Sequence, residues 1–119
     1  MYHASMHEMS LAISIVDLVC AKAAAVRATR VSEIELEVGA LAGVTIESLV
    51  FCFEAAAKET PAQTALLTVR EVSGRARCSS CARIFPVDSL VVPCPHCGAY
   101  TADIIGGREL RVVSFVIDE

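Results

Sequence analysis

The spacing of apolar and polar residues along the chain predicts two helices and three strands. Apolar residues at helical spacing, together with many alanines, predict an amphipathic helix over residues 9–27. In residues 32–38, Ser-Glu-Ile-Glu-Leu-Glu-Val, three aliphatic side chains face one way and three glutamates the other, which predicts a half-buried strand with its acidic face in water. Residues 64–72 and 108–117 are rich in β-forming residues and predict two further strands.

A turn containing glycine follows the first predicted strand, and Thr45 at its end is placed to act as the N-cap of a helix over residues 46–58. This helix fills the interval between the first two strands, and an interval of about 25 residues has the length of a right-handed crossover. We therefore expect these two strands to be parallel. The third strand follows an insert whose ends must lie close together, so we expect it to pair with the second strand as in a hairpin.

The insert, residues 74–106, has a composition unlike that of the rest of the chain. It contains four of the six cysteines and three of the four prolines, and it shows little periodicity. We therefore expect a main domain formed by residues 1–73 and 107–119, with Gly74, Gly106 and Gly107 as hinges to the insert. The predicted fold class is α+β, a small mixed three-stranded sheet with two helices and an inserted cysteine-rich module.

Composition and charge narrow the class of protein. The chain of 119 residues is 55% hydrophobic, which is ample for a core, and its formal net charge is -4. Such a charge does not draw a protein to nucleic acid or to an anionic membrane. The apolar stretches fall short of the ~20 residues that span a bilayer, and the N-terminus lacks the features of a secretory signal. We expect a cytoplasmic protein that binds neither nucleic acid nor membranes.

The most specific chemical pattern is formed by four cysteines: Cys78-Ser-Ser-Cys81, twelve residues, then Cys94-Pro-His-Cys97. In a reducing cytosol, grouped cysteines favour metal binding or redox use over structural disulfides. Two such turns that face each other supply the four thiolates of a tetrahedral Zn²⁺ site, and a site closed in this way is structural. Residues 74–106 are thus predicted to be a zinc ribbon that folds on metal binding, which contributes on the order of 10 kcal/mol in such units. A dithiol redox pair and an iron–sulfur site are the alternatives.

Outside the four-cysteine pattern, one histidine and two cysteines need an interpretation. His96 lies within the second cysteine turn, where it is either an exposed turn residue, a replacement ligand or a donor to sulfur. Cys20 and Cys52 stand alone in helix-like stretches and are interpreted as small buried hydrophobes.

The residues of the module bear on alternative functions as well. Between residues 73 and 107, three arginines and two aspartates give a charge of +1, and Phe85 and Tyr100 are the aromatic residues. A base-stacking platform on a basic track needs more of both. A zinc-ribbon module that binds nucleic acid or protein is one candidate function. We do not expect an enzyme, because the chain has three histidines and lacks a nucleophile elbow and a P-loop.

Four segments of the chain carry a family resemblance. They are MHEMSLAISIVDLV at residues 6–19, EIELEVGALAGVTIESLVFCFE at 33–54, the four-cysteine ribbon at 78–97 and GRELRVVSF at 107–115. In order, spacing and ribbon type they resemble the HypA/HybF family of nickel metallochaperones. The resemblance implies an accessory protein that helps to insert nickel into NiFe hydrogenase. It also implies two partners, a HypB-type GTPase and the precursor of the hydrogenase large subunit, and a homodimer is a further state to consider.

The resemblance also maps two metal sites onto the chain. A structural Zn(II) maps onto Cys78, Cys81, Cys94 and Cys97, and a site for Ni(II) maps onto Met6, His7 and Glu8. Ni²⁺ binds imidazole, deprotonated backbone amides and a terminal amine in square-planar or tetragonal arrangements, and a site at a chain end can release its cargo. For Glu8 the alternatives are a nickel ligand, an acceptor for His7 and an acid that stabilises the first turn of the helix.

The chain departs from the family pattern because residues 1–5 precede Met6, which turns the terminal amine of the nickel site into a peptide nitrogen. Three interpretations follow. In the first, translation starts at Met6. In the second, the amine of residue 1, two backbone amides and His3 form a separate nickel site. In the third, His3 and His7 lie on one face of a longer helix. The sequence of residues 5–8 fits a capping box, which would begin the helix at Met6 and leave His3 outside it.

Overall fold

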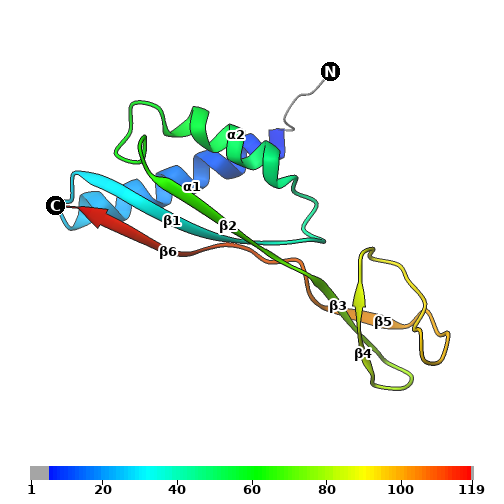
Figure 1. Ribbon diagram of the computed structural model, residues 1–119. Helices are drawn as coiled ribbons and strands as arrows, with labels where there is room; N and C mark the ends of the chain where they lie inside the picture. Colours follow the sequence, from blue (N-terminus) through cyan, green and yellow to red (C-terminus); the bar gives the residue numbers. More distant parts are fainter. Residues whose placement is uncertain (1–5, 119) are drawn as a thin grey trace. The chain divides into compact units, whose positions relative to one another are not determined.

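The computed structural model describes residues 6–118, which form two helices and two three-stranded sheets (Figure 1). The elements are, in order, α1 (Met6–Ala25), β1 (Arg30–Gly39), α2 (Ile46–Ala57), β2 (Leu66–Val72), β3 (Gly74–Cys78), β4 (Ile84–Val87), β5 (Ala102–Gly106) and β6 (Leu110–Asp118). Neither of the two helices has the length and apolarity needed to cross a membrane. The predicted α+β class, with two helices, a three-stranded sheet and an inserted module, is confirmed.

The chain divides into two compact units. Of the described residues, the first contains 6–36, Val44–Arg70 and 111–118. The second contains Glu37–Gly43 and Glu71–Leu110, and so includes β3, β4 and β5. The end of β1 and the turn after it therefore belong to the cysteine-containing unit, although the sequence places them in the main domain.

Both helices lie on one face of the first sheet (Figure 1). The residues of α1 that face the core recur every three or four positions and are at most 4% exposed: Ala12, Val16, Val19 and Ala23. The aliphatic side chains of β1 that the alternation identifies, Ile34, Leu36 and Val38, are buried too. The predicted helix and strand are confirmed because the same period that is visible in the sequence sets the buried face. The prediction is wrong for Glu37, which is buried rather than in water.

The first sheet has the order β2-β1-β6, with β1 in the centre. At the start of β1, the N–H of Val31 donates to the carbonyl of Pro61, shortly before β2. At its end, the N–H of Ala40 donates to the carbonyl of Val72, the last residue of β2. The start of β1 thus lies beside the start of β2 and the end of β1 beside the end of β2, so the two strands run parallel, as predicted.

The prediction that the third main-domain strand pairs with the second is wrong, because β6 pairs with β1. The N–H of Thr29 donates to the carbonyl of Asp118, and the N–H of Gly39 donates to that of Glu109, so β6 runs antiparallel to β1. Arg30 and Asp118 add an ion pair at 2.7 Å. The central place, where both strand edges are paired, goes to the strand whose side chains are most deeply buried. The hairpin-like pairing forms inside the insert instead, between β3 and β5.

The second sheet has the order β4-β3-β5, and β3 is antiparallel to both neighbours. Ala76 lies opposite Phe85 in β4 and Ile104 in β5, and the side chains of this face form a small core. The strands are four or five residues long. A strand of this length contains only two or three inward-facing residues, which explains why the sequence shows little periodicity here.

Three glycines of the second unit pack backbone against backbone. A Cβ atom on Gly39 would lie 2.0 Å from the carbonyl oxygen of Gly107, and one on Gly107 would lie 2.6 Å from the Cα of Gly74. Two hydrogen bonds of 2.6 Å hold this junction, from the N–H of Gly39 to Glu109 and from the N–H of Leu41 to Gly107. From the sequence, Gly74 and Gly107 were expected to act as hinges. In the structure they are needed because a larger side chain would not fit in this backbone packing.

Candidate metal centre

The two Cys-x-x-Cys segments fold into the same turn. In the first, the N–H of Ala82 donates to the carbonyl of Cys78, and in the second the N–H of Gly98 donates to that of Cys94, each at 2.8 Å. The residue after the second cysteine has a left-handed backbone in both turns, with φ 65° at Ala82 and 79° at Gly98. The sequence signals this conformation at Gly98, which needs no Cβ, but not at Ala82, since alanine rarely adopts it.

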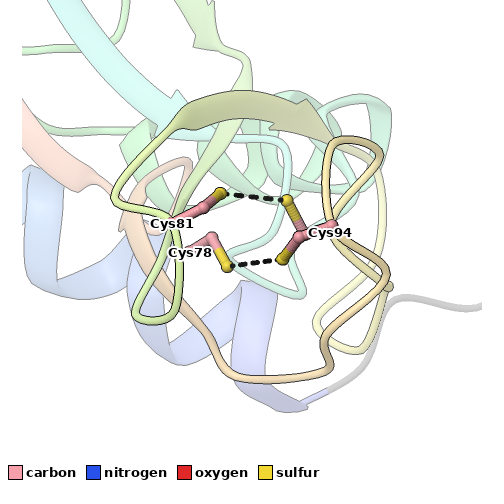
Figure 2. A group of neighbouring side chains, drawn as sticks. Cys78, Cys81 and Cys94 are labelled. Atoms are coloured by element: carbon pink, nitrogen blue, oxygen red, sulfur yellow. Dashed lines mark hydrogen bonds between the residues drawn. The ribbon is translucent and has the colours of Figure 1, made fainter.

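The sulfur atoms of the two turns point into one common space, as Figure 2 shows for the labelled Cys78, Cys81 and Cys94. All four sulfurs lie within 4.8 Å of one another. The Cys78 and Cys97 sulfurs are 3.6 Å apart, and the Cys81 and Cys94 sulfurs are 3.7 Å apart. Four sulfurs at about 2.3 Å from a central Zn²⁺ form a tetrahedron with edges of about 3.8 Å. The spacing thus fits a four-thiolate site and is too long for disulfides.

The thiols of the cluster change one another's ionisation. The backbone N–H of Cys81 stabilises the thiolate of Cys78 and lowers the pKa of Cys78 to about 6. At Cys97, the backbone N–H of Ala99 favours the thiolate, but the neighbouring Cys78 sulfur, desolvation and the other thiols outweigh it and raise the pKa to about 11. One thiolate is therefore favoured at the expense of another. A divalent cation removes this conflict, because it allows all four sulfurs to be negative together.

Two of the cysteines also belong to the core of the second unit. Cys78 and Cys94 are buried and pack with Ala76, Phe85 and Val87. Five buried side chains are a small core for an independently folded unit, which at this size usually needs a metal or cross-links. The four-cysteine cluster lies where a larger apolar core would otherwise be, so the residues present fit a resident structural zinc ion.

His96 contacts Arg83 through its side chain and a sulfur of the cluster through its backbone. Its Nδ1 lies 3.1 Å from a guanidinium nitrogen of Arg83, and its backbone N–H donates to the sulfur of Cys94 at 3.4 Å. The imidazole is exposed. The donor to sulfur that the sequence suggests at this position is thus the peptide N–H, not the ring.

His7 and Glu8, the residues that the resemblance places at the nickel site, differ in their surroundings. His7 is exposed in the first turn of α1, whereas Glu8 is 5% exposed. The Glu8 carboxylate accepts the backbone N–H of Thr45 at 3.4 Å. Thr45 is the N-cap residue of α2, but its own side chain makes no capping hydrogen bond. Glu8 therefore joins the starts of the two helices, a contact that no local pattern indicates.

The remaining residues named from the sequence are distributed as follows. Met6 is the first residue of α1, which begins where the capping-box interpretation begins it. His3 and Ser5 lie outside the described residues, so the interpretations that depend on them stay predictions. Cys52 is buried in α2, as expected for a small hydrophobe, and Cys20 in α1 is half-buried.

The Glu8 contact leads to a stability prediction. Glu8→Ala removes the acceptor of the Thr45 N–H and leaves that donor at a part-buried helix start, so we expect a loss of about 1–2 kcal/mol in the free energy of unfolding. Glu8→Gln keeps a carbonyl acceptor and should lose less than half as much. Glu47→Ala, at an exposed acid in the first turn of α2, is the control and should lose about 0.5 kcal/mol or less. Urea unfolding measures all three, and equal losses for Glu8→Ala and Glu47→Ala would contradict the assigned contact.

Comparison with known proteins identifies the family. Residues 6–117 match the family described as hydrogenase/urease nickel incorporation, metallochaperone, hypA. The chain belongs to the HypA family. The resemblance inferred from the sequence is thus confirmed, and the family is one of metallochaperones rather than enzymes.

Curated relatives named hydrogenase maturation factor HypA share close to half of their residues with the chain. The protein from Chlorobium phaeobacteroides is 51% identical over 113 residues, which cover 95% of this chain and 100% of that protein. The protein from Parabacteroides distasonis is 46% identical over 112 residues, which cover 94% and 97%. The chain is thus similar to these HypA proteins over almost its whole length.

Solved structures support the fold. A solution structure of HypA protein superposes with a TM-score of 0.71 at 23% identity, covering 96% of this chain and 98% of that one. The solution structure of the Ni metallochaperone HypA from Helicobacter pylori superposes with a TM-score of 0.66 at 21% identity, covering 93% and 97%. At these identities the likeness concerns the fold of this HypA-family chain.

Proposed function

We propose that the protein binds Ni(II) near its N-terminus and delivers it to the large-subunit precursor of NiFe hydrogenase during maturation. The observation that carries the proposal is the family match over residues 6–117, which includes Met6, His7 and Glu8. The exposure of His7 at the start of α1 supports it, since a site of transfer must be accessible to a receiving protein. The cargo is a substrate here, taken up and released.

The proposed nickel ligands are the imidazole of His7 and neighbouring backbone nitrogens. If the chain begins at Met6, its amine joins them; if residue 1 is the first, His3 offers a second nitrogen-rich site. Nitrogen donors of this kind suit the geometries that Ni²⁺ accepts. Glu8 fits a supporting role better than that of a ligand, because its carboxylate is buried and accepts the N–H of Thr45. It would hold the helix end that presents His7.

For the second metal, we propose that Cys78, Cys81, Cys94 and Cys97 hold a structural Zn(II), within a module of residues 74–106. The sulfur spacing supports this assignment. A closed four-thiolate shell leaves no position for water or substrate, so zinc would stabilise the unit and take no part in nickel exchange. Thiolate ligands stay available in a reducing compartment, so we place the protein in the cytoplasm.

The proposed partners are a HypB-type GTPase and the hydrogenase precursor. A GTPase that supplies or receives nickel must dock close to the ligands, so its proposed contact is the exposed side of α1 beside His7. Charge-reversing changes on that side of α1 should weaken the complex, and changes in the zinc ribbon should not.

His7→Ala tests the nickel function. We expect nickel affinity to fall at least tenfold, because the one imidazole of the site is lost, and hydrogenase activity to disappear in cells whose own copy is deleted. Zinc content and the unfolding midpoint should stay unchanged, since His7 is exposed. Isothermal titration with nickel and hydrogenase assays measure these effects.

His96→Ala is the matched control for this experiment, because His96 is also exposed but lies in the second unit. It should leave nickel affinity as it is. Titration of forms that begin at Met1 and at Met6, each verified by intact mass, separates the amine of Met6 from the site at His3. Normal hydrogenase maturation with His7→Ala would refute the assignment and favour a zinc-ribbon binding module without nickel function.

A further inference from the structure

The outer face of the second sheet carries two adjacent arginines. Arg75 and Arg77 alternate with Ala76 and Cys78 along β3, and both are exposed, while Ala76 and Cys78 point into the core. The arginines are therefore on the face of the sheet opposite to the core that contains the cysteine cluster. This arginine face is defined by Arg75, Arg77 and the two side chains described next.

An isoleucine lies on each side of the arginines. Ile84 of β4 is paired directly with Arg77 and is 41% exposed, and Ile105 of β5 is 46% exposed. Ile105 lies between the partners of Arg75 and Ala76 in the β3–β5 register. The two isoleucines thus place exposed aliphatic surface on both sides of the two charges.

The guanidinium groups of the arginine face have no acidic partner among residues 6–118. The side chains of Arg75 and Arg77 make no ion pair or hydrogen bond within that part of the chain; Asp103, the β5 partner of Arg77, lies on the same face but is not ion-paired with it. Each group keeps its five N–H donors free for a ligand. The Glu109 carboxylate lies beside Gly106, the β5 partner of Arg75, and one of its oxygens accepts the N–H of Gly107 at 2.7 Å.

The spacing of the two arginines selects for one type of ligand. Side chains two positions apart on one strand are separated by about 6.6–6.8 Å, which is also the spacing of alternate side chains in an extended peptide. A guanidinium binds a carboxylate through two parallel hydrogen bonds, and flanking apolar groups strengthen such pairs by excluding water. We propose that the arginine face docks an extended acidic segment of a partner protein, with carboxylates at alternate positions facing Arg75 and Arg77.

This inference goes beyond the nickel function proposed above, because no step of it uses His7 or nickel. Two other occupants fit the surface less well. Nucleic acid fits less well, because two arginines on a short strand do not make the longer basic track that a phosphate backbone needs. A second copy that offered its acidic residues to the arginine face would make a head-to-tail contact between different surfaces, which leads to rings or open chains rather than a closed dimer.

The test uses the full chain and a ten-residue peptide in which glutamate alternates with threonine, followed by NMR at low salt. We expect saturable shifts of the amides around Arg75, Arg77, Ile84 and Ile105, which weaken as salt is raised. A peptide with glutamine in place of glutamate should not bind. Arg75→Gln with Arg77→Gln should weaken binding at least tenfold while zinc content and nickel binding are kept.

Lys22→Gln with Arg27→Gln is the matched control, because it removes the same charge from exposed positions of the first unit. It should leave peptide binding unchanged. If the double arginine variant loses zinc, Arg75→Lys and Arg77→Lys replace it; each keeps the charge but loses the two-bond geometry, and each should bind about threefold more weakly. Nickel binding is measured on the same samples. If the parent protein binds the peptide but not nickel, the nickel function is refuted and the docking proposal stands.

Four results with added peptide or DNA would overturn the proposal. They are equal binding of the glutamine peptide, shifts outside the arginine face, an unchanged affinity of the double arginine variant, and preferential binding of duplex DNA. Concentration-dependent shifts of the same amides without peptide, absent in the double arginine variant, would identify a second copy as the occupant and would likewise refute it.

Discussion

Cys81→Ser is expected to abolish stoichiometric zinc binding and to unfold β3, β4 and β5, while α1, α2 and the sheet packed on them stay folded. The Cys81 sulfur lies 3.7 Å from that of Cys94 and is one of four atoms that share the proposed ion. Serine cannot supply a thiolate, and the remaining core of this unit is small. Metal analysis should fall from one zinc per chain toward zero, and the amide resonances of β3, β4 and β5 should lose their dispersion.

Cys20→Ser provides the control for this change, because Cys20 is also half-buried but lies in α1, away from the cluster. It should keep full zinc content and lose little stability. Removing zinc from the parent protein with a chelator should reproduce the effect of Cys81→Ser, and adding zinc back should reverse it. Full zinc content and unchanged melting of Cys81→Ser would exclude the four-thiolate site.

Gly39→Ala is expected to destabilise the protein by about 3 kcal/mol or more, which is at the upper end for overpacking. The new methyl group would lie 2.0 Å from the carbonyl oxygen of Gly107 and 2.6 Å from the backbone nitrogen of Arg108. Both are backbone atoms that cannot rotate away. To make room, the chain must break the hydrogen bonds that join Gly39 to Glu109 and Leu41 to Gly107.

Gly43→Ala separates this effect from the general cost of replacing a glycine. Gly43 has φ 74° but no atom within 4 Å of an added Cβ, so alanine there should cost only the backbone strain of about 1 kcal/mol. Urea unfolding of both variants gives the comparison. If Gly39→Ala is no less stable than Gly43→Ala, the close packing of the glycine junction is not present in solution.

What the sequence determined by itself was local. The two helices were expected over residues 9–27 and 46–58 and lie at 6–25 and 46–57. These helices, the alternation of β1 and the pairing of two cysteine turns all rest on spacings within about twenty residues, and each spacing sets which side chains share a face. The four cysteines could be proposed as one site because a Cys-x-x-Cys turn brings its own two sulfurs together whatever the rest of the chain does. The family resemblance depended on the order of these same local segments.

The tertiary structure decided what depends on contacts between distant segments. It places β6 beside β1 instead of β2, because a sheet gives its doubly paired position to the strand with the deepest burial, and hydrophobicity alone does not rank neighbours. It buries Glu8 against the N–H of Thr45, 37 positions away, and packs Gly39 against Gly107. Such contacts leave no periodic trace, since each involves single residues whose partners are chosen by the fold.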